Sequence, residues 1–408
     1  MHWRQNPQGI AWIILIGNFI ACCVLAVAVP LGLRSFILHS TRPEQTWLAA
    51  TAGTVQLQAA GAREPAAVTE RRPVTEGSLI VTDNTAQALL TIAADESGAQ
   101  IVATIQMLQD TTLRLERART PRFGLSSDPN RIVLELVRGR ALIRTQSAGG
   151  RGVQAVLSTP HGRISFGVGA FDVLIEGQET QVRARAGVAH VLAANTEVTV
   201  NSGERSSIIA GRPPSLPVPG ALNLVLNGEF GGNLAPAWRQ VIETEPGREP
   251  GEITTETDGA RRAVRFTRRT EDGAPNRVGV QQILDRDVQG YESLALRFDL
   301  LLRYQSVPGG GYLASEYPVM VDIQYTDVYG NKDLHWYQGF YYLDLPTGSP
   351  WKLPAGHKIP LGVWYTFESP NLFERLRDNR PARINSITIY ASGHDYESLI
   401  ADVALLAR

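Results

Sequence analysis

Residues 318–325 read PVMVDIQY, and an apolar side chain stands at every second position from Val319 to Tyr325. Successive side chains of a β-strand point to opposite faces of its sheet, so this alternation predicts a strand with one buried face. A turn containing Gly330 follows, and residues 334–343, LHWYQGFYYL, read as a returning strand. We therefore expect a β-hairpin in the middle of the C-terminal half of the chain.

The returning strand and the residues after it are rich in tryptophan and tyrosine, which suggests sugar binding. Sugar rings stack their C–H faces on such side chains, while sugar hydroxyl groups need planar polar partners such as Asp322, Gln324, His335 or Asp344. Because side chains alternate along a strand, about half of the aromatic residues are instead expected in the core. The candidate ligand-binding residues are Trp336, Tyr337, Tyr341, Tyr342, Trp351 and Trp364.

The β-pattern extends beyond this hairpin. Residues 384–390 alternate in the same way. One short helix is expected near residues 369–376, where Ser369 would be the N-cap residue and Pro370 would occupy the first helical position. We therefore predict that residues 222–408 form a domain built almost entirely of strands.

Both ends of this C-terminal domain carry recognisable motifs. Residues 223–230 read NLVLNGEF and Trp238 follows, which resembles the opening of carbohydrate-binding modules with a galactose-binding-like jelly roll. Residues 401–405, ADVAL, resemble the last strand of those modules. The resemblance implies a jelly-roll β-sandwich over residues 222–408, with its first and last strands paired, that binds a glycan.

The same resemblance implies a metal ion. Such modules often hold one structural calcium ion between the first turn and the last strand, and the matching candidate ligands are Glu229 and Asp402. Carboxylate oxygens suit a hard cation such as Ca²⁺, although backbone carbonyls would have to supply the remaining ligands. The alternative is that both residues are ordinary surface acids.

The first half of the chain is also built of short alternating runs separated by glycine and Asx turns, over residues 47–210. Its motifs follow one another in an order that resembles a FecR-type domain: EGSLIVT at 76–82, LELVRGRALI at 134–143, LSTPHG at 157–162 and VRARAGVAHV at 182–191. The resemblance implies an extracytoplasmic β-domain. FecR regulators of iron uptake also carry a cytoplasmic domain that controls a sigma factor, and the nine residues 1–9 are too few to fold as one.

A proline-rich segment separates the two halves. Residues 211–220 read GRPPSLPVPG and contain four prolines, a composition that favours an extended chain of about 3 Å per residue. All twelve tyrosines lie at or after Tyr291, which marks a change of composition between the halves. We interpret residues 211–221 as the linker between two domains.

An apolar segment lies near the N-terminus. Residues 10–33 contain no charged residue, and about 20 apolar residues are enough to span a bilayer as a helix. We predict a transmembrane helix over residues 10–33, a cytoplasmic tail over residues 1–9 and an extracytoplasmic location for the rest. A cleaved signal peptide is the alternative. Both cysteines, Cys22 and Cys23, lie in this segment, so no disulfide framework is expected in the outer domains.

The composition and motifs argue against several classes of function. The formal net charge of −1 gives no basic footprint of the kind that nucleic-acid binding requires. The sequence contains no His-Glu-x-x-His motif and no Gly-x-Ser-x-Gly motif, and it has no cysteine outside the apolar segment. We therefore expect a protein that is not an enzyme and that has no nucleic-acid partner.

The expected fold class is all-β: an N-terminal transmembrane helix, a FecR-like β-domain and then a jelly-roll β-sandwich. We expect a single-pass cell-membrane protein whose C-terminal domain binds a glycan or another component of the cell envelope. One alternative is signalling of the FecR type through a membrane or periplasmic partner. A further alternative is a structural role in adhesion or assembly.

Overall fold

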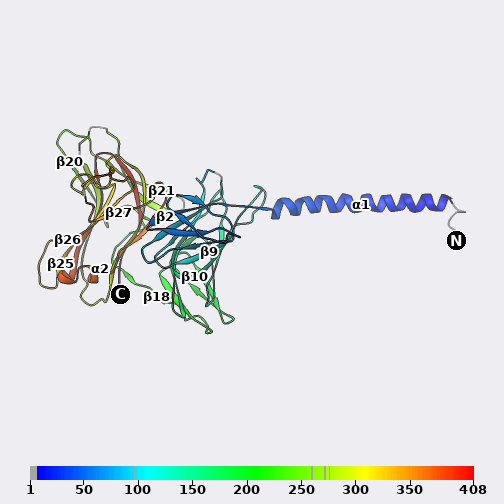
Figure 1. The fold of residues 1–408 in the computed structure, drawn as a ribbon, viewed down its shortest axis with the longest axis horizontal. Helices are drawn as coiled ribbons and strands as arrows, with labels where there is room; N and C mark the ends of the chain where they lie inside the picture. Colours follow the sequence, from blue (N-terminus) through cyan, green and yellow to red (C-terminus); the bar gives the residue numbers. More distant parts are fainter. Residues whose placement is uncertain (1–6, 96, 259–260, 271–272, 275, 351) are drawn as a thin grey trace.

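A single long helix and two β-structured parts make up the computed structural model (Figure 1). The structure describes residues 7–408 except 96, 259–260, 271–272, 275 and 351. Strands dominate both parts beyond the helix, which confirms the predicted all-β fold class with one N-terminal apolar helix. We call residues 41–219 the barrel and residues 222–407 the sandwich.

Helix α1, Pro7–His39, projects away from the β-structure as one rod (Figure 1). Its stretch Ala11–His39 is long and apolar enough to cross a membrane, and the rest of the chain does not cover it. A signal sequence near an N-terminus has the same properties. The helix is longer than the predicted 10–33, because it continues through Pro30 and includes residues 34–39.

The barrel is formed by strands β1 to β18, which close on themselves. One sheet region contains β1 Thr41–Pro43, β3 Val55–Gln58, β4 Ala66–Val68, β6 Ser78–Val81, β9 Thr112–Pro121, β11 Val153–Ser158, β12 Arg163–Phe166, β15 Ala189–Ala193 and β16 Thr196–Val200. The other contains β2 Gln45–Ala52, β5 Arg72–Pro73, β7 Gln87–Ala93, β8 Ile101–Met107, β13 Gly169–Glu176, β14 Glu179–Ala186, β17 Glu204–Ile209 and β18 Val218–Pro219. Strand β10, Asn130–Thr145, belongs to both regions.

Gly139 marks the point where β10 passes from one sheet region into the other. Residues before it pair with β9, and residues from Gly139 to Thr145 pair with β13. Gly139 has a φ of 86°, and a Cβ atom added there would lie 2.5 Å from the Cα atom of Thr111. Any other residue would therefore be strained at this position. The strand–glycine–strand motif of the sequence forms a corner of the barrel.

The barrel core follows the alternation of the sequence. In β14, Val182 and Ala184 are fully buried among other apolar side chains, while Arg183 and Arg185 lie on the opposite face. The same strand therefore contributes apolar groups to the core and cations to the outside of the barrel. That outer face of the barrel is the one that meets the sandwich.

The proline-rich segment runs along the barrel. Its strand β18 pairs with Glu204 and Arg205 of β17, and the backbone N–H of Ser215 donates to the carbonyl oxygen of Ser207 at 2.8 Å. The segment is extended, as its prolines predict, and it is attached to the barrel instead of standing free. The chain enters the sandwich directly after it.

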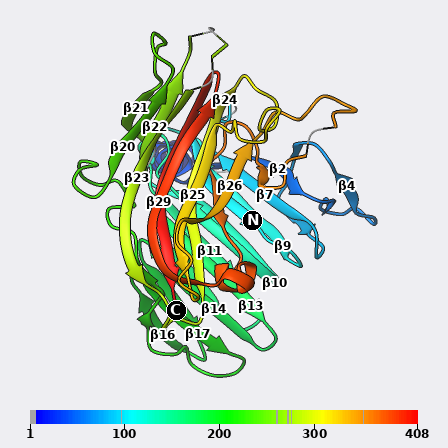
Figure 2. The ribbon, with the colours of Figure 1, turned by 90° about the vertical axis from the view of Figure 1, so that its left-hand side faces the viewer.

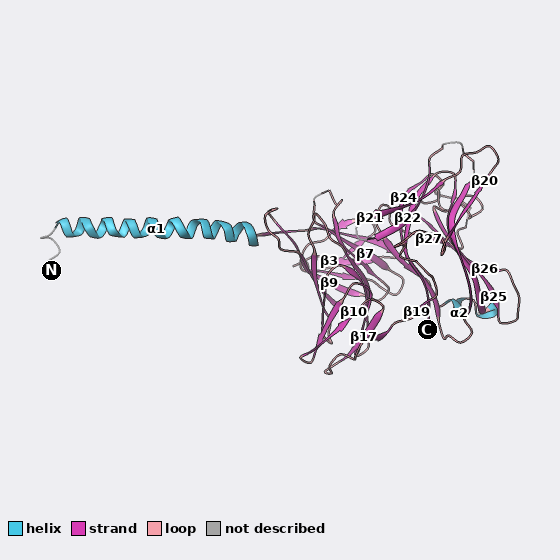
Figure 3. Ribbon diagram, turned by 180° about the vertical axis from the view of Figure 1, so that it is seen from behind, coloured by secondary structure: helices cyan, strands magenta, loops and turns pink. Residues whose placement is uncertain are grey.

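The sandwich consists of two mainly antiparallel sheets with a hydrophobic core between them. The barrel-side sheet has the order β21 Glu252–Asp258, β22 Arg261–Arg268, β30 Tyr396–Ala407, β24 Leu294–Gln305 and β28 Tyr365–Glu368, with β19 Leu222–Asn223 paired to β30. The far sheet has the order β20 Arg239–Thr244, β23 Asn276–Asp287, β29 Pro381–Gly393, β25 Val319–Asp327, β26 Leu334–Tyr341 and β27 Gly356–Lys358. Figure 2 shows the long curved strands of the far sheet from outside, and Figure 3 shows the two domains from behind.

The predicted hairpin is present as β25 and β26. The two strands pair antiparallel from Val319 opposite Phe340 to Tyr325 opposite Leu334. Val319, Ile323 and Tyr325 are buried in the sandwich core, as the alternation predicts. The paired first and last strands, β19 and β30, were also expected and are observed.

The short helix near residue 372 differs from the prediction at its start. Helix α2 is Leu372–Arg375, and the side chain of Asn371 accepts a hydrogen bond from the N–H of Phe373. Asn371 is therefore the N-cap residue, and the assignment of Ser369 to that role was wrong. The hydroxyl of Ser369 instead accepts from the backbone N–H of Leu296, so it serves the neighbouring strand. A single-turn 3₁₀-helix, η1 Arg377–Asn379, follows.

Candidate functional site

The outer face of the barrel is joined to the sandwich by buried ion pairs. Arg140 of β10 lies 2.7 Å from Asp172 of β13 and 2.9 Å from Glu368 of β28. Arg183 of β14 also donates to Asp172, at 3.0 Å. Burial acts to lower the pKa of Arg140, but the two carboxylates outweigh it, and the pKa is raised. Arg140 therefore remains charged and holds β10 against β28.

A second cluster centres on Asp299 of β24, which is completely buried. It accepts hydrogen bonds from Arg144 of the barrel, from Arg261 of β22 at 3.1 Å and from the hydroxyl of Thr366 at 2.6 Å. Arg144 also donates to Asp402 of β30. Burial acts to raise the pKa of Asp299, but the surrounding guanidinium groups lower it below its ordinary value. The aspartate is thus a buried anion that both domains share.

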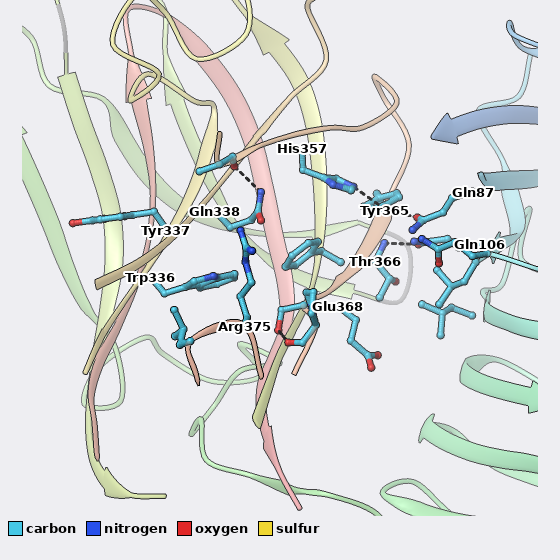
Figure 4. A pocket seen from close by; sticks show the side chains of 18 of the residues that line it. Gln87, Gln106, Trp336, Tyr337, Gln338, His357, Tyr365, Thr366, Glu368 and Arg375 are labelled. Atoms are coloured by element: carbon cyan, nitrogen blue, oxygen red, sulfur yellow. Dashed lines mark hydrogen bonds between the residues drawn. The ribbon is translucent and has the colours of Figure 1, made fainter. Parts of the chain in front are cut away.

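A cleft of about 940 Å³ lies beside these ion pairs, between the barrel and the open edge of the sandwich (Figure 4). Its size is in the range of ligand sites, roughly 300–1,000 Å³. The barrel contributes Gln87, Gln106, Gln109, Leu142 and Arg140. The sandwich contributes residues from β26, from the edge strands β27 and β28, and from helix α2: Trp336, Gln338, His357, Tyr365, Glu368 and Arg375.

Hydrogen bonds across the cleft orient its polar side chains (Figure 4). The hydroxyl of Tyr365 donates to Oε1 of Gln87 at 3.2 Å and lies 3.0 Å from Nε2 of His357. The backbone N–H of Thr366 donates to Oε1 of Gln106, also at 3.2 Å. The sandwich therefore holds the amide oxygens of both barrel glutamines at the cleft wall.

The ionisable groups of this network are uncharged at neutral pH. Burial lowers the pKa of His357 and raises the pKa of Tyr365. Because the Tyr365 hydroxyl donates to Gln87, Nε2 of His357 must carry its hydrogen, and Nδ1 is left as an acceptor. The cleft thus offers amide, imidazole and guanidinium groups, which together can donate to and accept from a polar ligand.

Two of the predicted aromatic residues line the cleft. Trp336 and Tyr337 are neighbours on β26 and point to opposite sides (Figure 4). Trp336 is 9% exposed and packs in the core beside the cleft, whereas Tyr337 is 43% exposed. The ring of Tyr337 stacks on that of His335, with centroids 5.4 Å apart and an interplanar angle of 2°. Nδ1 of His335 lies 2.7 Å from Oδ1 of Asp322, which fixes this stack.

The other predicted aromatic residues lie elsewhere. Tyr341 is half-buried at the end of β26, and the hydroxyl of Tyr342 accepts from the backbone N–H of Gln305 at 3.1 Å. Trp364 is buried where the barrel-side sheet meets the barrel. Trp351 lies outside the described residues. The structure does not bring Tyr341, Tyr342 or Trp364 into the cleft, and a ligand-binding role for these three and for Trp351 stays a prediction.

The two predicted calcium ligands share one small cavity of about 150 Å³. Asp402 already accepts a hydrogen bond from Arg144, and Arg185 and Arg297 line the same cavity as Glu229. Calcium takes six to eight oxygen ligands, whereas this cavity combines two carboxylates with nearby guanidinium groups. In the described part of the chain, no three His, Cys, Asp or Glu side chains are grouped as metal ligands. The residues fit a calcium ion poorly, and the ion stays a prediction.

Sequence reasoning missed the barrel side of the cleft. Gln87 is 278 positions from Tyr365, and Gln106 is 260 positions from Thr366, so no local pattern relates them. His357 and Arg375 belong to no recognisable motif. One signal was available: Arg140 and Arg144 are bulky cations on the outer face of a strand with a buried inner face, and they need partners.

Comparisons with known proteins give partial likenesses. No protein-family model matches the chain, and no curated protein matches it. Among solved structures, one described as an anti-sigma factor from Parabacteroides distasonis is 14% identical with a TM-score of 0.26. The match covers 35% of this chain and 59% of that protein, so the chain spans less than two thirds of that protein's length.

Carbohydrate-binding modules also match, over a little less than half of this chain. The module TmCBM61, solved in complex with β-1,4-galactotriose, is 14% identical with a TM-score of 0.27, covering 46% of this chain and 100% of the module. The family 11 module of the cellulosomal cellulase Lic26A-Cel5E of Clostridium thermocellum is 19% identical with a TM-score of 0.26, covering 46% and 95%. At these values the likenesses support no argument about ligands. The chain is similar in part to both kinds of protein, and membership of either family is not shown.

Proposed function

We propose that this chain is a binding protein of the cell envelope that takes a glycan in the cleft between its two domains. The observation that supports this most is the composition of the cleft. Trp336 lies at one wall, and the amides of Gln87, Gln106 and Gln338 line the same space. Aromatic surface beside planar polar groups suits a sugar, which has apolar C–H faces and many hydroxyl groups.

The location proposed for this activity is the outer side of a cell membrane. Helix α1 provides an apolar length sufficient to span a bilayer, and the β-structure follows it on one side. The resemblances to FecR-like domains and to galactose-binding-like modules agree with such a location, because both kinds of domain occur in exported proteins. The proposal places residues 41–408 outside the membrane with the cleft accessible to envelope polymers.

Arg375 offers a direct test of the cleft, because it lines the cleft from α2 and its side chain is exposed. Arg375→Ala should weaken glycan binding about tenfold, the effect of losing one charged hydrogen bond of roughly 1.5 kcal/mol. Glycan arrays would identify a ligand for the full chain in detergent, and titration calorimetry would then measure the affinity.

Arg377→Ala is the matched control, because Arg377 is an exposed arginine two positions away that does not line the cleft. It should leave the affinity unchanged. Equal weakening by both substitutions, or no binding of any arrayed glycan by the unmodified protein, would contradict the proposal.

A further inference from the structure

The contact between the barrel and the sandwich contains more buried cations than buried anions. The ion pairs above join four carboxylates, those of Asp172, Asp299, Glu368 and Asp402, to three arginines of the barrel and to Arg261 of the sandwich. Two further arginines, Arg185 of β14 and Arg297 of β24, lie in the same contact. These two arginines therefore give the contact an excess of positive charge.

Arg297 is the less satisfied of the pair. Arg297 is only 7% exposed, and its Nε and Nη1 atoms are buried without a hydrogen-bond acceptor among the described residues. Burial first, and then the neighbouring charge of Arg185, lower the pKa of Arg297 to about 9, although the charges of Glu368 and Asp172 act in the opposite direction. Burying a guanidinium N–H group without a hydrogen-bond acceptor costs free energy. A ligand that supplies an acceptor beside Arg297 would lower this cost.

Arg185 faces the same cavity from the barrel. Its side chain is 7% exposed, and its Nε is also buried without an acceptor in the part of the chain that the structure describes. Its closest carboxylate is Asp299, with Nη2 and Oδ1 3.7 Å apart, beyond hydrogen-bond distance. Asp299 is already shared by Arg144, Arg261 and Thr366, so it does not neutralise Arg185 fully.

The cavity that both arginines line has room for a ligand. Its volume is about 150 Å³, well above the roughly 30 Å³ that one water molecule occupies in the liquid. Its other polar wall residues are Asn223, Asp402, which is held by Arg144, and Glu229, which is exposed. The arginines are thus the buried part of the wall, and an acid lies at the exposed side.

We propose that this cavity is an oxyanion site in which a phosphate or sulfate group bridges Arg185 of the barrel and Arg297 of the sandwich. Guanidinium groups bind tetrahedral oxyanions through paired N–H donors, and the two arginines approach from different domains. The bound oxyanion supplies the missing acceptors and separates two like charges. It therefore tightens the contact between the domains. This site is separate from the glycan cleft and does not depend on the glycan proposal.

Thermal unfolding of the full chain in detergent tests the site. Inorganic phosphate should raise the melting temperature in a saturable way, by roughly 3–6 °C, relative to sodium chloride at equal ionic strength. Glycerol 3-phosphate distinguishes the source: a larger rise than with inorganic phosphate indicates the phosphate of an organic ester, and a smaller rise indicates the free ion. Either rise supports the site, and a rise matched by sodium chloride overturns it.

Variants assign the effect to the two arginines. Arg297→Gln should abolish the phosphate-dependent rise, because the substitution removes one of the two guanidinium groups that hold the ion. Arg286→Gln is the control, because Arg286 is an exposed arginine on β23, and it should keep the full rise. Arg185→Gln provides a second variant if Arg297→Gln does not fold. An undiminished rise in either folded variant, confirmed by titration calorimetry with phosphate, overturns the proposal.

Discussion

Glu44 is a buried acid at the point where the chain passes from helix α1 into the barrel. It is 7% exposed, and neither carboxylate oxygen has a hydrogen-bond partner among the described residues. Burial raises its pKa from 4.5 to about 8. The side chain is therefore neutral in the folded protein at neutral pH, and charged when the chain unfolds.

This difference makes stability depend on pH. Between the unfolded and folded pKa values the folded state holds the extra proton, so the stability contributed by Glu44 is complete below about pH 4.5 and is lost as pH rises toward 8. The unfolding free energy should fall by roughly 1 kcal/mol per pH unit over this range relative to Glu44→Gln. Denaturant titrations of both proteins from pH 5 to 8 measure the difference. If the unfolding free energies of the two proteins changed in parallel with pH, the pKa of Glu44 would not be raised by burial.

For single residues, the sequence predicted which face of a strand a side chain lies on better than it predicted whether that side chain is buried. The alternation on β26 places Trp336 and Tyr337 on opposite sides, and the structure agrees. It gives no information about what covers each side, so the burial of Trp336 at the cleft wall and of Trp364 against the barrel was not predictable. A buried aromatic residue and one that binds sugar share the same local pattern.

The proposed location of the protein rests on helix α1. Its apolar length fits both a permanent membrane span and a signal sequence that is removed. The proposed anchor predicts that mature protein from the membrane fraction begins within the first residues and resists extraction by alkaline carbonate. N-terminal sequencing measures this directly. A mature chain that begins after Pro30 and is released as a soluble protein would contradict the anchor.

Elements defined by local patterns were predictable, whereas their exact ends depended on tertiary partners. The hairpin β25–β26 follows from period-two alternation and a turn, in which the Asp327 side chain accepts from the N–H groups of Tyr329 and Asn331. The start of α2 was wrong because Ser369 and Asn371 are both good N-cap residues. The structure selects Asn371, since the neighbouring strand uses Ser369.

At the scale of the whole molecule, the arrangement of the two domains could not be derived from the sequence. The ion pairs that join them connect residues far apart in the chain, such as Arg140 to Glu368, 228 positions away. Buried ion pairs contribute little net stability compared with apolar packing, but removing one partner leaves an uncompensated charge. These pairs therefore favour the orientation of barrel and sandwich in which the cleft lies between them.

A cleft shared by both domains requires barrel and sandwich to keep one fixed orientation. Spin labels at Leu125→Cys on the barrel and Tyr329→Cys on the sandwich, both sites being more than 70% exposed, report the distance between the domains when Cys22 and Cys23 are replaced by serine. A Leu125→Cys, Val188→Cys pair within the barrel gives the reference width. Pulsed electron–electron double resonance should show a single distance peak as narrow as that reference. A broad or multiply peaked distribution would show that the domains move independently, and would contradict a binding cleft shared by both domains.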